Sequence, residues 1–177
     1  EALTAWFNPT INSYKRINAP VTASGATWSP NTITYSGNNR THMIRVPGPG
    51  RFELRLMDGA TNPYLLQAGI LAAGIDGIEK KRKPGKPVNV NMYEEAHKVK
   101  GAKKLPLSLP QALSNLDKSK VLKNAFGKDV VNSYITLKNR EIKKYNSSKE
   151  KKIGFKGSKS NKSNLITQWE RDNTLDC

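Results

Sequence analysis

The first half of the chain contains a short segment in which apolar and charged positions strictly alternate. In RFELRLMDG, residues 51–59, three apolar side chains alternate with Arg51, Glu53 and Arg55. Successive side chains on a strand point to opposite faces, so the pattern predicts a strand with one apolar face and one charged face. A solvated strand with ion pairs between neighbours is one interpretation, and a binding surface for anions is the other.

A second short apolar run, in the segment NNRTHMIRVP, lies just upstream and carries Arg40 and Arg45. The residues PGPG separate the two runs, and alternating proline and glycine is a strong turn signal. The pattern therefore predicts a β-hairpin with strands at about 41–46 and 51–57. Folding back in this way would gather the arginines of both strands around Glu53.

The pattern changes after the hairpin, where small and apolar residues occupy nearly every position of YLLQAGILAAGIDGI. Asn62 is a good helix N-cap and Pro63 suits the first helical position, so a helix is predicted from Pro63 to about Ile78. Because this helix would be apolar on every side, we expect it to be buried and to cover the sheet.

The rest of the chain predicts irregular structure first and helices later. Residues 1–36 are rich in Asn, Pro, Ser, Thr and Gly, which favours loop and short strand. Ser108 and Gln111 have capping-box spacing, so one helix is expected from there to a stop at Gly127. Asp129 is expected to cap another helix, with an apolar stripe of Val130, Val131, Tyr134, Ile135 and Ile142. Strands followed by helices predict an α+β fold.

The composition is that of one globular unit, because 177 residues with 36% hydrophobic content can bury a single core. The longest apolar stretch, Tyr64 to Ile75, is too short to cross a bilayer, so no membrane partner is expected. A single cysteine, Cys177, excludes an internal disulfide framework and is typical of a reducing compartment. The chain opens at Glu1 without a signal-peptide pattern, and we interpret it as a fragment of a cytoplasmic protein.

The net charge of +16 is unevenly distributed. Residues 1–78 hold 6 Lys and Arg against 4 Asp and Glu, whereas residues 79–177 hold 24 against 10. The excess is mostly lysine scattered among serine and asparagine, a composition that more often remains solvated than forms a binding groove. We therefore expect residues 146–164 to be a disordered lysine-rich loop, and we expect no nucleic-acid partner.

The arginines of the predicted hairpin favour a polyanionic substrate. Arginine presents a planar fork of donors that fits carboxylate and phosphate oxygens. Glu53 among arginines is best explained by a divalent metal, because phosphate transfer usually needs one. His42 lies close to these residues, but no second histidine or cysteine is near it in the sequence. A packed or hydrogen-bonding role is therefore expected for His42 rather than metal binding.

The segments NPTINSYKR, NNRTHMIRVP and RFELRLMDGATNPYLLQAGILAAGIDGI together resemble the C-terminal half of the catalytic domain of a glutamine synthetase, over about residues 6–144. VNMYEEAHKVKGAKKLP and the ending WERDNTLDC resemble the bacterial type III branch, which includes gamma-glutamylmethylamide synthetases. The resemblance implies an incomplete antiparallel barrel covered by helices, with residues 1–145 as part of that domain. Residues 165–177 would form a C-terminal segment, and the full-length protein would be a ringed homo-oligomer, a dodecamer.

The resemblance also implies a role for each arginine. Arg16 would bind glutamate, Arg40 and Arg45 would contact ATP and the transferred phosphoryl group, and Arg55 would bind glutamate, with Arg40 and Arg55 catalytic. Glu53 would hold Mg²⁺ or Mn²⁺. In the implied reaction, ATP converts the substrate carboxylate into gamma-glutamyl phosphate, which an amine attacks. Arginines and a metal are suited to stabilise the negative charge that both steps gather.

Two departures from the family pattern leave alternatives open. Many members carry a glutamate on a flap after the SYKR motif, but no acidic residue lies between Arg16 and Arg40 here. The amine could therefore be ammonia or methylamine. The second departure is that the beta-grasp domain and the other metal-binding residues of the family are missing, so this fragment alone is expected to be inactive. A non-catalytic basic binding or assembly module is the alternative from another class.

Overall fold

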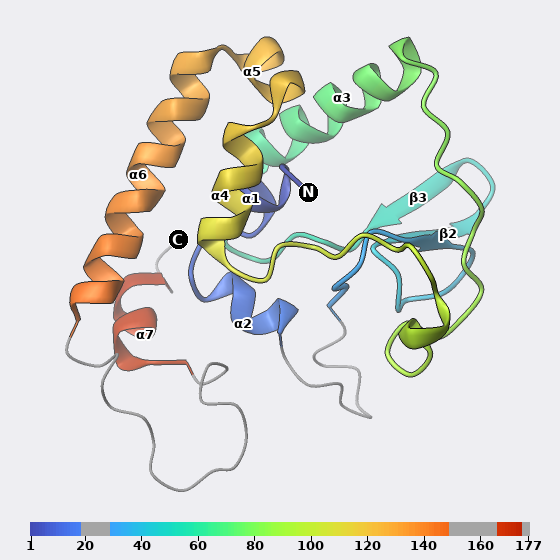
Figure 1. Cartoon of the computed structure of the whole chain (residues 1–177), viewed down its shortest axis with the longest axis horizontal. Coiled ribbons are helices and arrows are strands. Elements are labelled where there is room, and N and C mark those ends of the chain that lie inside the picture. The colour runs from blue at the N-terminus through green and yellow to red at the C-terminus, as the bar shows by residue number, and fades with distance from the viewer. Residues whose placement is uncertain (19–28, 149–165, 175–177) are drawn as a thin grey trace, which may run out of the picture.

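The computed structural model describes residues 1–18, 29–148 and 166–174, and most of the predicted lysine-rich loop lies outside these residues. Within them, helices gather on one side of the molecule and a β-hairpin lies on the other (Figure 1). None of the helices in the described part of the chain is long and apolar enough to cross a membrane.

The N-terminal residues form two short helices, so the prediction of loop and strand was wrong for residues 1–17, whereas residues 29–36 are loop and short strand as predicted. Helix α1 spans Thr4–Phe7 and helix α2 spans Ser13–Ile17. All four residues of α1 are buried, so tertiary packing overrides the weak helix propensity of this segment. Thr10 stabilises the start of α2, because its hydroxyl accepts a hydrogen bond from the Ser13 amide at 3.1 Å.

The sheet has three strands in the order β1 (Tyr35–Ser36), β2 (Ile44–Gly48) and β3 (Arg51–Leu54). Strands β2 and β3 pair antiparallel, which confirms the predicted hairpin, although β3 ends three residues earlier than predicted. Strand β1 pairs with β2 in parallel. The turn of the hairpin contains Gly50 with a φ of 76°, a left-handed conformation that favours glycine.

Helix α3 spans Pro63–Glu79 and starts as predicted, because the Asn62 side chain accepts hydrogen bonds from two amides of the first turn. Its predicted burial was wrong. The helix packs against α1 and α5 rather than on the sheet, and its large side chains at Tyr64, Leu71, Ile75 and Ile78 are 54–82% exposed. The close approach to α1 occurs at Gly69, where an added Cβ would lie 2.8 Å from the Leu3 side chain.

The helix predicted from Ser108 to Phe126 is two helices, α4 (Leu109–Asp117) and α5 (Lys120–Phe126). Ser108 caps α4 as predicted, but Ser119 caps a second start by accepting a hydrogen bond from the Leu122 amide. Two good N-cap residues within one apolar pattern therefore divide the helix.

Helix α6 spans Lys128–Ser147 and begins one residue before the predicted cap. Gly127, with a φ of 85°, occupies the N-cap position, and Asp129 lies inside the first turn, so the assignment of Asp129 as the cap was wrong. A short 3-10 helix covers Ala96–Lys98, and α7 covers Gln168–Thr174. Helix α7 contacts α6 where the ring of Trp169 meets that of Tyr145 edge-on, at 5.2 Å between centroids.

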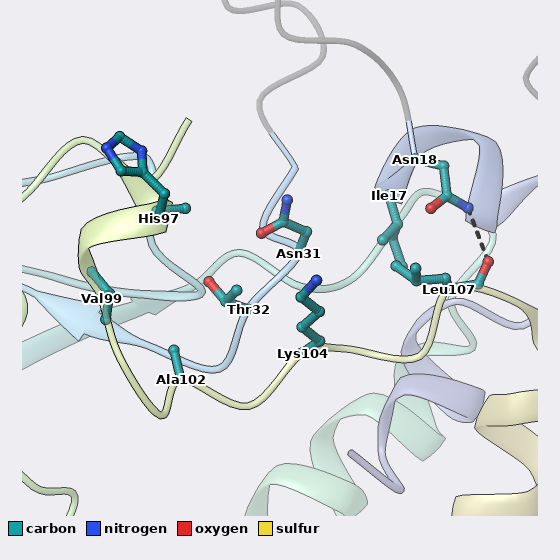
Figure 2. A pocket seen from close by; sticks show the side chains of 10 residues that line it. Ile17, Asn18, Asn31, Thr32, His97, Val99, Ala102, Lys104 and Leu107 are labelled. Carbon is teal, nitrogen blue, oxygen red and sulfur yellow. Dashed lines mark hydrogen bonds between the residues drawn. The ribbon is translucent and has the colours of Figure 1, made fainter. Parts of the chain in front are cut away.

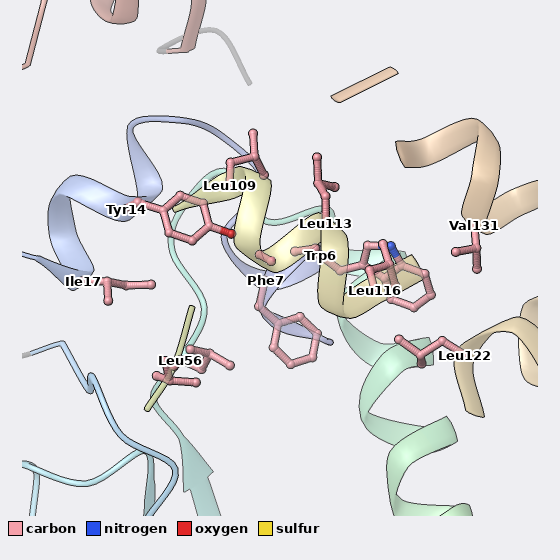
Figure 3. Packing of buried hydrophobic residues seen from close by; sticks show 13 residues of the cluster. Trp6, Phe7, Tyr14, Ile17, Leu56, Leu109, Leu113, Leu116, Leu122 and Val131 are labelled. Atoms are coloured by element: carbon pink, nitrogen blue, oxygen red, sulfur yellow. The ribbon is translucent and has the colours of Figure 1, made fainter. Parts of the chain in front are cut away.

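The core lies among α1, α4, α5 and α6, and Trp6 is at its centre (Figure 3). The Trp6 ring meets the rings of Phe126 and Tyr134 edge-on, at 5.0 and 6.3 Å. The Tyr134 hydroxyl also donates to the Ala5 carbonyl at 2.7 Å, which ties α6 to α1. Leu56, just after β3, is 4% exposed and joins this core, so the hairpin is anchored to the helices at its C-terminal end.

Candidate functional site

The charged face of β3 is an ion-paired cluster. Arg45 on β2 lies opposite Glu53 on β3, and its Nη1 donates to Glu53 Oε2 at 2.6 Å. Arg55 Nε donates to the other carboxylate oxygen at 3.0 Å. The hydrogen bond from Arg45, followed by the weaker effects of Arg55, lowers the pKa of Glu53. The side chains of Arg45 and Arg55 are only 12% and 15% exposed, whereas that of Glu53 is 42% exposed. The carboxylate is therefore open to solvent, and the two arginines that bind it are largely buried.

A loop residue that the sequence analysis missed orients Arg45. Asn38 lies between β1 and β2, and its side-chain oxygen accepts hydrogen bonds from Nε and Nη2 of Arg45, the first at 2.9 Å. The guanidinium is therefore held by Asn38 on one edge and by Glu53 on the other. Such a fixed fork is suited to bind a planar or tetrahedral anion.

Arg16, on α2, is held by buried polar groups. Its Nη2 donates to the Asn8 side-chain oxygen at 3.2 Å and to the Leu56 carbonyl. Asn8 is fully buried and donates to the same carbonyl at 3.1 Å, so it fixes the position of Arg16. The buried Nε of Arg16 has no hydrogen-bond partner among the residues that the structure describes.

The charges around Arg16 place it in one electrostatic group with Arg55. Burial lowers the pKa of Arg16, Asp58 opposes this shift, and Arg55 reinforces it. Tyr93 also acts on Arg16, and burial raises the pKa of Tyr93 itself. Asp58 and Tyr93 were not assigned to the site from the sequence, because nothing in their local pattern marks them as neighbours of an arginine.

The structure does not bring every predicted site residue into the cluster. Arg40 is exposed, and it forms no ion pair within the described part of the chain. Arg51 is also exposed and lies across from Gly48 at the turn end of the hairpin. His42, which follows Arg40 closely, is fully buried and hydrogen-bonded to Thr34 and Val90, as the prediction of a hydrogen-bonding role required.

The cluster of Arg45, Glu53 and Arg55 contains one carboxylate that could bind a divalent metal, that of Glu53. No group of three possible metal-binding side chains occurs among the described residues. A divalent cation of the magnesium class usually takes six oxygen ligands, of which several can be waters. Glu53 is exposed enough to supply one oxygen, so it fits the role of a single ligand in a site that other parts of a longer protein would complete.

The cavity drawn in Figure 2, about 550 Å³ in volume, is separate from the arginine cluster, because none of the clustered arginines lines it. Its lining includes Thr32, His97 and Lys104, together with Asn18, whose side chain donates to the Leu107 carbonyl at 2.9 Å. The residues that line it carry no member of the Arg45, Glu53 and Arg55 group, so the cluster remains the candidate site.

A comparison with protein families shows to which family the chain belongs. Residues 1–153 match the family of the glutamine synthetase catalytic domain. The chain belongs to the glutamine synthetase family. This confirms the expected α+β fold of part of that catalytic domain, and it places the Arg45, Glu53 and Arg55 group inside the matched region.

Similar proteins include two kinds of ligase. The chain is 55% identical to a glutamine synthetase from Rhizobium leguminosarum bv. phaseoli over 175 residues, which cover 99% of this chain and 36% of that protein. It is 46% identical to a glutamate–methylamine ligase from Methyloversatilis universalis over 147 residues, covering 81% of this chain and 33% of that protein.

Solved structures agree with the family assignment. A structure described as a GmaS/ADP complex is 50% identical, with a TM-score of 0.77, and the match covers 99% of this chain and 36% of that chain. A Plasmodium falciparum glutamine synthetase is 28% identical with a TM-score of 0.62, covering 82% of this chain and 36% of that chain. The chain therefore spans about a third of the length of the glutamine synthetase relatives that it matches.

Proposed function

We propose that this chain is the arginine-rich part of an ATP-dependent glutamate–ammonia ligase that acts through gamma-glutamyl phosphate. The observation that carries the proposal is the cluster of Arg45 on β2, Glu53 on β3 and Arg55 just after β3, with Arg16 in the same electrostatic group. The cluster gathers fixed positive charge where a ligase of this kind must hold two anions, the carboxylate of glutamate and the phosphates of ATP.

Each residue of the cluster takes a role that suits its position. Arg16 and Arg55 hold the glutamate substrate, and the buried Nε of Arg16 supplies a donor toward it. Arg45, fixed by Asn38, contacts the phosphates of ATP. Arg40, whose side chain is exposed, would contact the phosphates and the transferred phosphoryl group once ATP is bound.

Glu53 is the residue proposed to hold a divalent metal, Mg²⁺ or Mn²⁺, with other ligands supplied from outside the described residues. A bound metal would neutralise phosphate charge during transfer. Within this chain, the two arginines keep Glu53 ionised, since their hydrogen bonds lower its pKa. The same two hydrogen bonds fix the orientation of the carboxylate, which remains exposed to solvent and available to bind a metal.

Methylamine is the second candidate for the attacking amine. The chain is 46% identical to a glutamate–methylamine ligase, and the GmaS/ADP structure is a close structural match. The segment between Arg16 and Arg40 contains no acidic residue, although a carboxylate would help to bind and deprotonate an ammonium ion. A cytoplasmic location and a ringed homo-oligomer, a dodecamer, complete the proposal for the full-length protein.

The test is phosphate release from ATP by the full-length protein that carries these 177 residues, with glutamate and either ammonia or methylamine. We expect release that requires glutamate, an amine and a divalent metal together. A higher kcat/KM for methylamine would make the second candidate the function. Phosphate release that does not depend on glutamate would overturn the proposal, and so would the absence of phosphate release with either amine. The 177-residue chain alone should show no turnover, because it offers one carboxylate in the arginine cluster.

A further inference from the structure

The β1–β2 loop, residues 37–41, has a fixed backbone although Asn38 within it is exposed. The Gly37 carbonyl accepts hydrogen bonds from the Asn39 amide at 2.7 Å and from the Val46 amide at 3.2 Å. The second of these bonds ties the loop to the middle of β2. The backbone on one side of Asn38 is therefore held to the strand that carries part of the candidate site.

Asn39 fixes the loop on the other side of Asn38. Its side-chain oxygen accepts from the Thr41 amide at 2.9 Å and from the Thr41 hydroxyl at 2.8 Å, the pattern of an Asx turn. Its Nδ2 donates to the Val90 carbonyl at 3.0 Å, which joins the loop to the segment that follows α3. Because both neighbours of Asn38 are held by hydrogen bonds, the position of Asn38 relative to β2 is set before any ligand binds.

From this fixed position, Asn38 holds one edge of the Arg45 guanidinium. Its Oδ1 accepts from Nε at 2.9 Å and also from Nη2, while Glu53 accepts from the third nitrogen, Nη1, at 2.6 Å. A guanidinium has five N–H donors, two on each terminal nitrogen and one on Nε. Contacts within the described residues use one N–H of each nitrogen, so one donor on Nη1 and one on Nη2 remain for a ligand.

Both groups that bind Arg45 are open to solvent. Asn38 is exposed and the Glu53 side chain is 42% exposed, whereas Arg45 itself is 12% exposed. The guanidinium is thus held on two sides without being closed off from the solution. Arginine binds a phosphate most firmly when two of its N–H groups donate in parallel to two oxygens. The two remaining donors of Arg45 lie on different nitrogens, as this contact requires.

We propose that Asn38 is a positioning residue for ATP: it holds the Nε edge of Arg45, so that Nη1 and Nη2 bind two oxygens of one phosphate group. This inference rests on the proposed function, in which Arg45 contacts the phosphates of ATP. Without Asn38, Arg45 keeps its charge and its bond to Glu53, but its guanidinium can turn and must be ordered again when ATP binds. Glutamate binding should be spared, because Arg16 is held instead by Asn8.

The experiment measures KM for ATP and KM for glutamate in the full-length protein and its variants. Asn38→Ala should raise KM for ATP about tenfold, the effect of one hydrogen bond to a charged group, and leave KM for glutamate unchanged. Its thermal unfolding should match that of the wild type, because Asn38 is exposed. The control is Asn124→Ala, the same substitution at an exposed position of α5, which should change neither constant.

A double variant tests whether Asn38 acts through Arg45. Arg45→Lys keeps the charge but loses the two parallel donors, so it should itself raise KM for ATP. Adding Asn38→Ala to Arg45→Lys should then raise KM for ATP no further, because the group that Asn38 positions is gone. A general structural role for Asn38 would instead multiply the two effects.

Three outcomes would overturn the inference alone while the wild type turns over ATP and glutamate. These are an unchanged KM for ATP in Asn38→Ala, an equal rise of both constants in that variant, and multiplied effects in the double variant. An unchanged KM for ATP in Arg45→Lys would remove Arg45 from the nucleotide site, and this inference with it. A wild-type protein without glutamate-dependent phosphate release would instead overturn the proposed function.

Discussion

The helical region and the sheet region of this chain are held together by different forces. In the helical region, α1 and α4–α6 bury Trp6, Leu116 and Val131 at no more than 1% exposure. In the sheet region, residues 88–93 and the segment 34–42 are joined mainly through hydrogen bonds between polar groups. Packing of apolar side chains therefore stabilises the helical region. The geometry of the sheet region depends instead on a hydrogen-bond network in which each donor has a particular acceptor.

Because of this difference, the residues that stabilise the fold and the residues of the candidate site lie in different parts of the molecule. The charged groups of the candidate site all lie on or next to the sheet region, where carboxylate and amide oxygens accept hydrogen bonds from arginines of low exposure. Leu56 connects the two regions, because it belongs to the core and its carbonyl accepts from Arg16. Substitutions in the helical region should consequently lower stability, and those in the sheet region should lower activity.

The largest effect on stability is expected from Leu116→Ala. Leu116 is 0% exposed in the core, so the substitution should lower the free energy of unfolding by about 2–5 kcal/mol. Urea or thermal unfolding of the full-length protein measures it. The control is Leu137→Ala on α6, where the side chain is 59% exposed and a change within about 0.5 kcal/mol is expected. Equal losses in the two variants would contradict the core described above.

Arg55→Lys should lower kcat/KM for glutamate about 10- to 100-fold, with little change in unfolding. Lysine keeps the charge but cannot reproduce the planar fork that binds Glu53 and a carboxylate together, and hydrogen bonds to charged groups contribute about 1.5–3 kcal/mol each. Arg51→Lys is the matched control, because Arg51 belongs to the same RFELR segment but is exposed at the turn end. Wild-type kinetics for Arg55→Lys would remove Arg55 from the substrate site.

A smaller effect is expected at the start of α3. Asn62→Ala removes the side-chain oxygen that accepts from two amides, which should lower the free energy of unfolding by about 1 kcal/mol. Asn132→Ala, at an exposed position inside α6, provides the same substitution without a capping role. The account expects Asn62→Ala to leave KM for both substrates unchanged. A selective rise in either constant would show that α3 acts on the site.

The elements that the sequence predicted well are those with strong local signals. The PGPG turn gave the hairpin, and Asn62 with Pro63 gave the start of α3. Local signals could not predict α1 and α2, because these helices have four and five residues and depend on burial rather than propensity. The burial of α3 was misjudged for a related reason, since an all-round apolar pattern does not say which faces find a partner within this chain.

The candidate site was predictable only in part. Alternation along β3 and the hairpin turn correctly placed Arg45 and Arg55 on either side of Glu53. Asn38 and Asn8, which orient arginines 45 and 16, were missed because the contacts depend on loop geometry and on the packing of α1 against the segment after β3. Arg40 was expected in the same group, but it is exposed and forms no ion pair within the described residues, which its position in the sequence did not indicate.

The central claim is that the charged face of β3 is part of a ligase site rather than a solvated strand with ion pairs. Glu53→Gln in the full-length protein tests it most directly, because the change keeps the size of the side chain and removes its charge. Turnover is measured across a Mg²⁺ and a Mn²⁺ titration, with unfolding followed in parallel and Glu79→Gln, at the exposed end of α3, as the control. We expect severe loss of turnover at every metal concentration with little change in unfolding. Wild-type turnover across both titrations would contradict it.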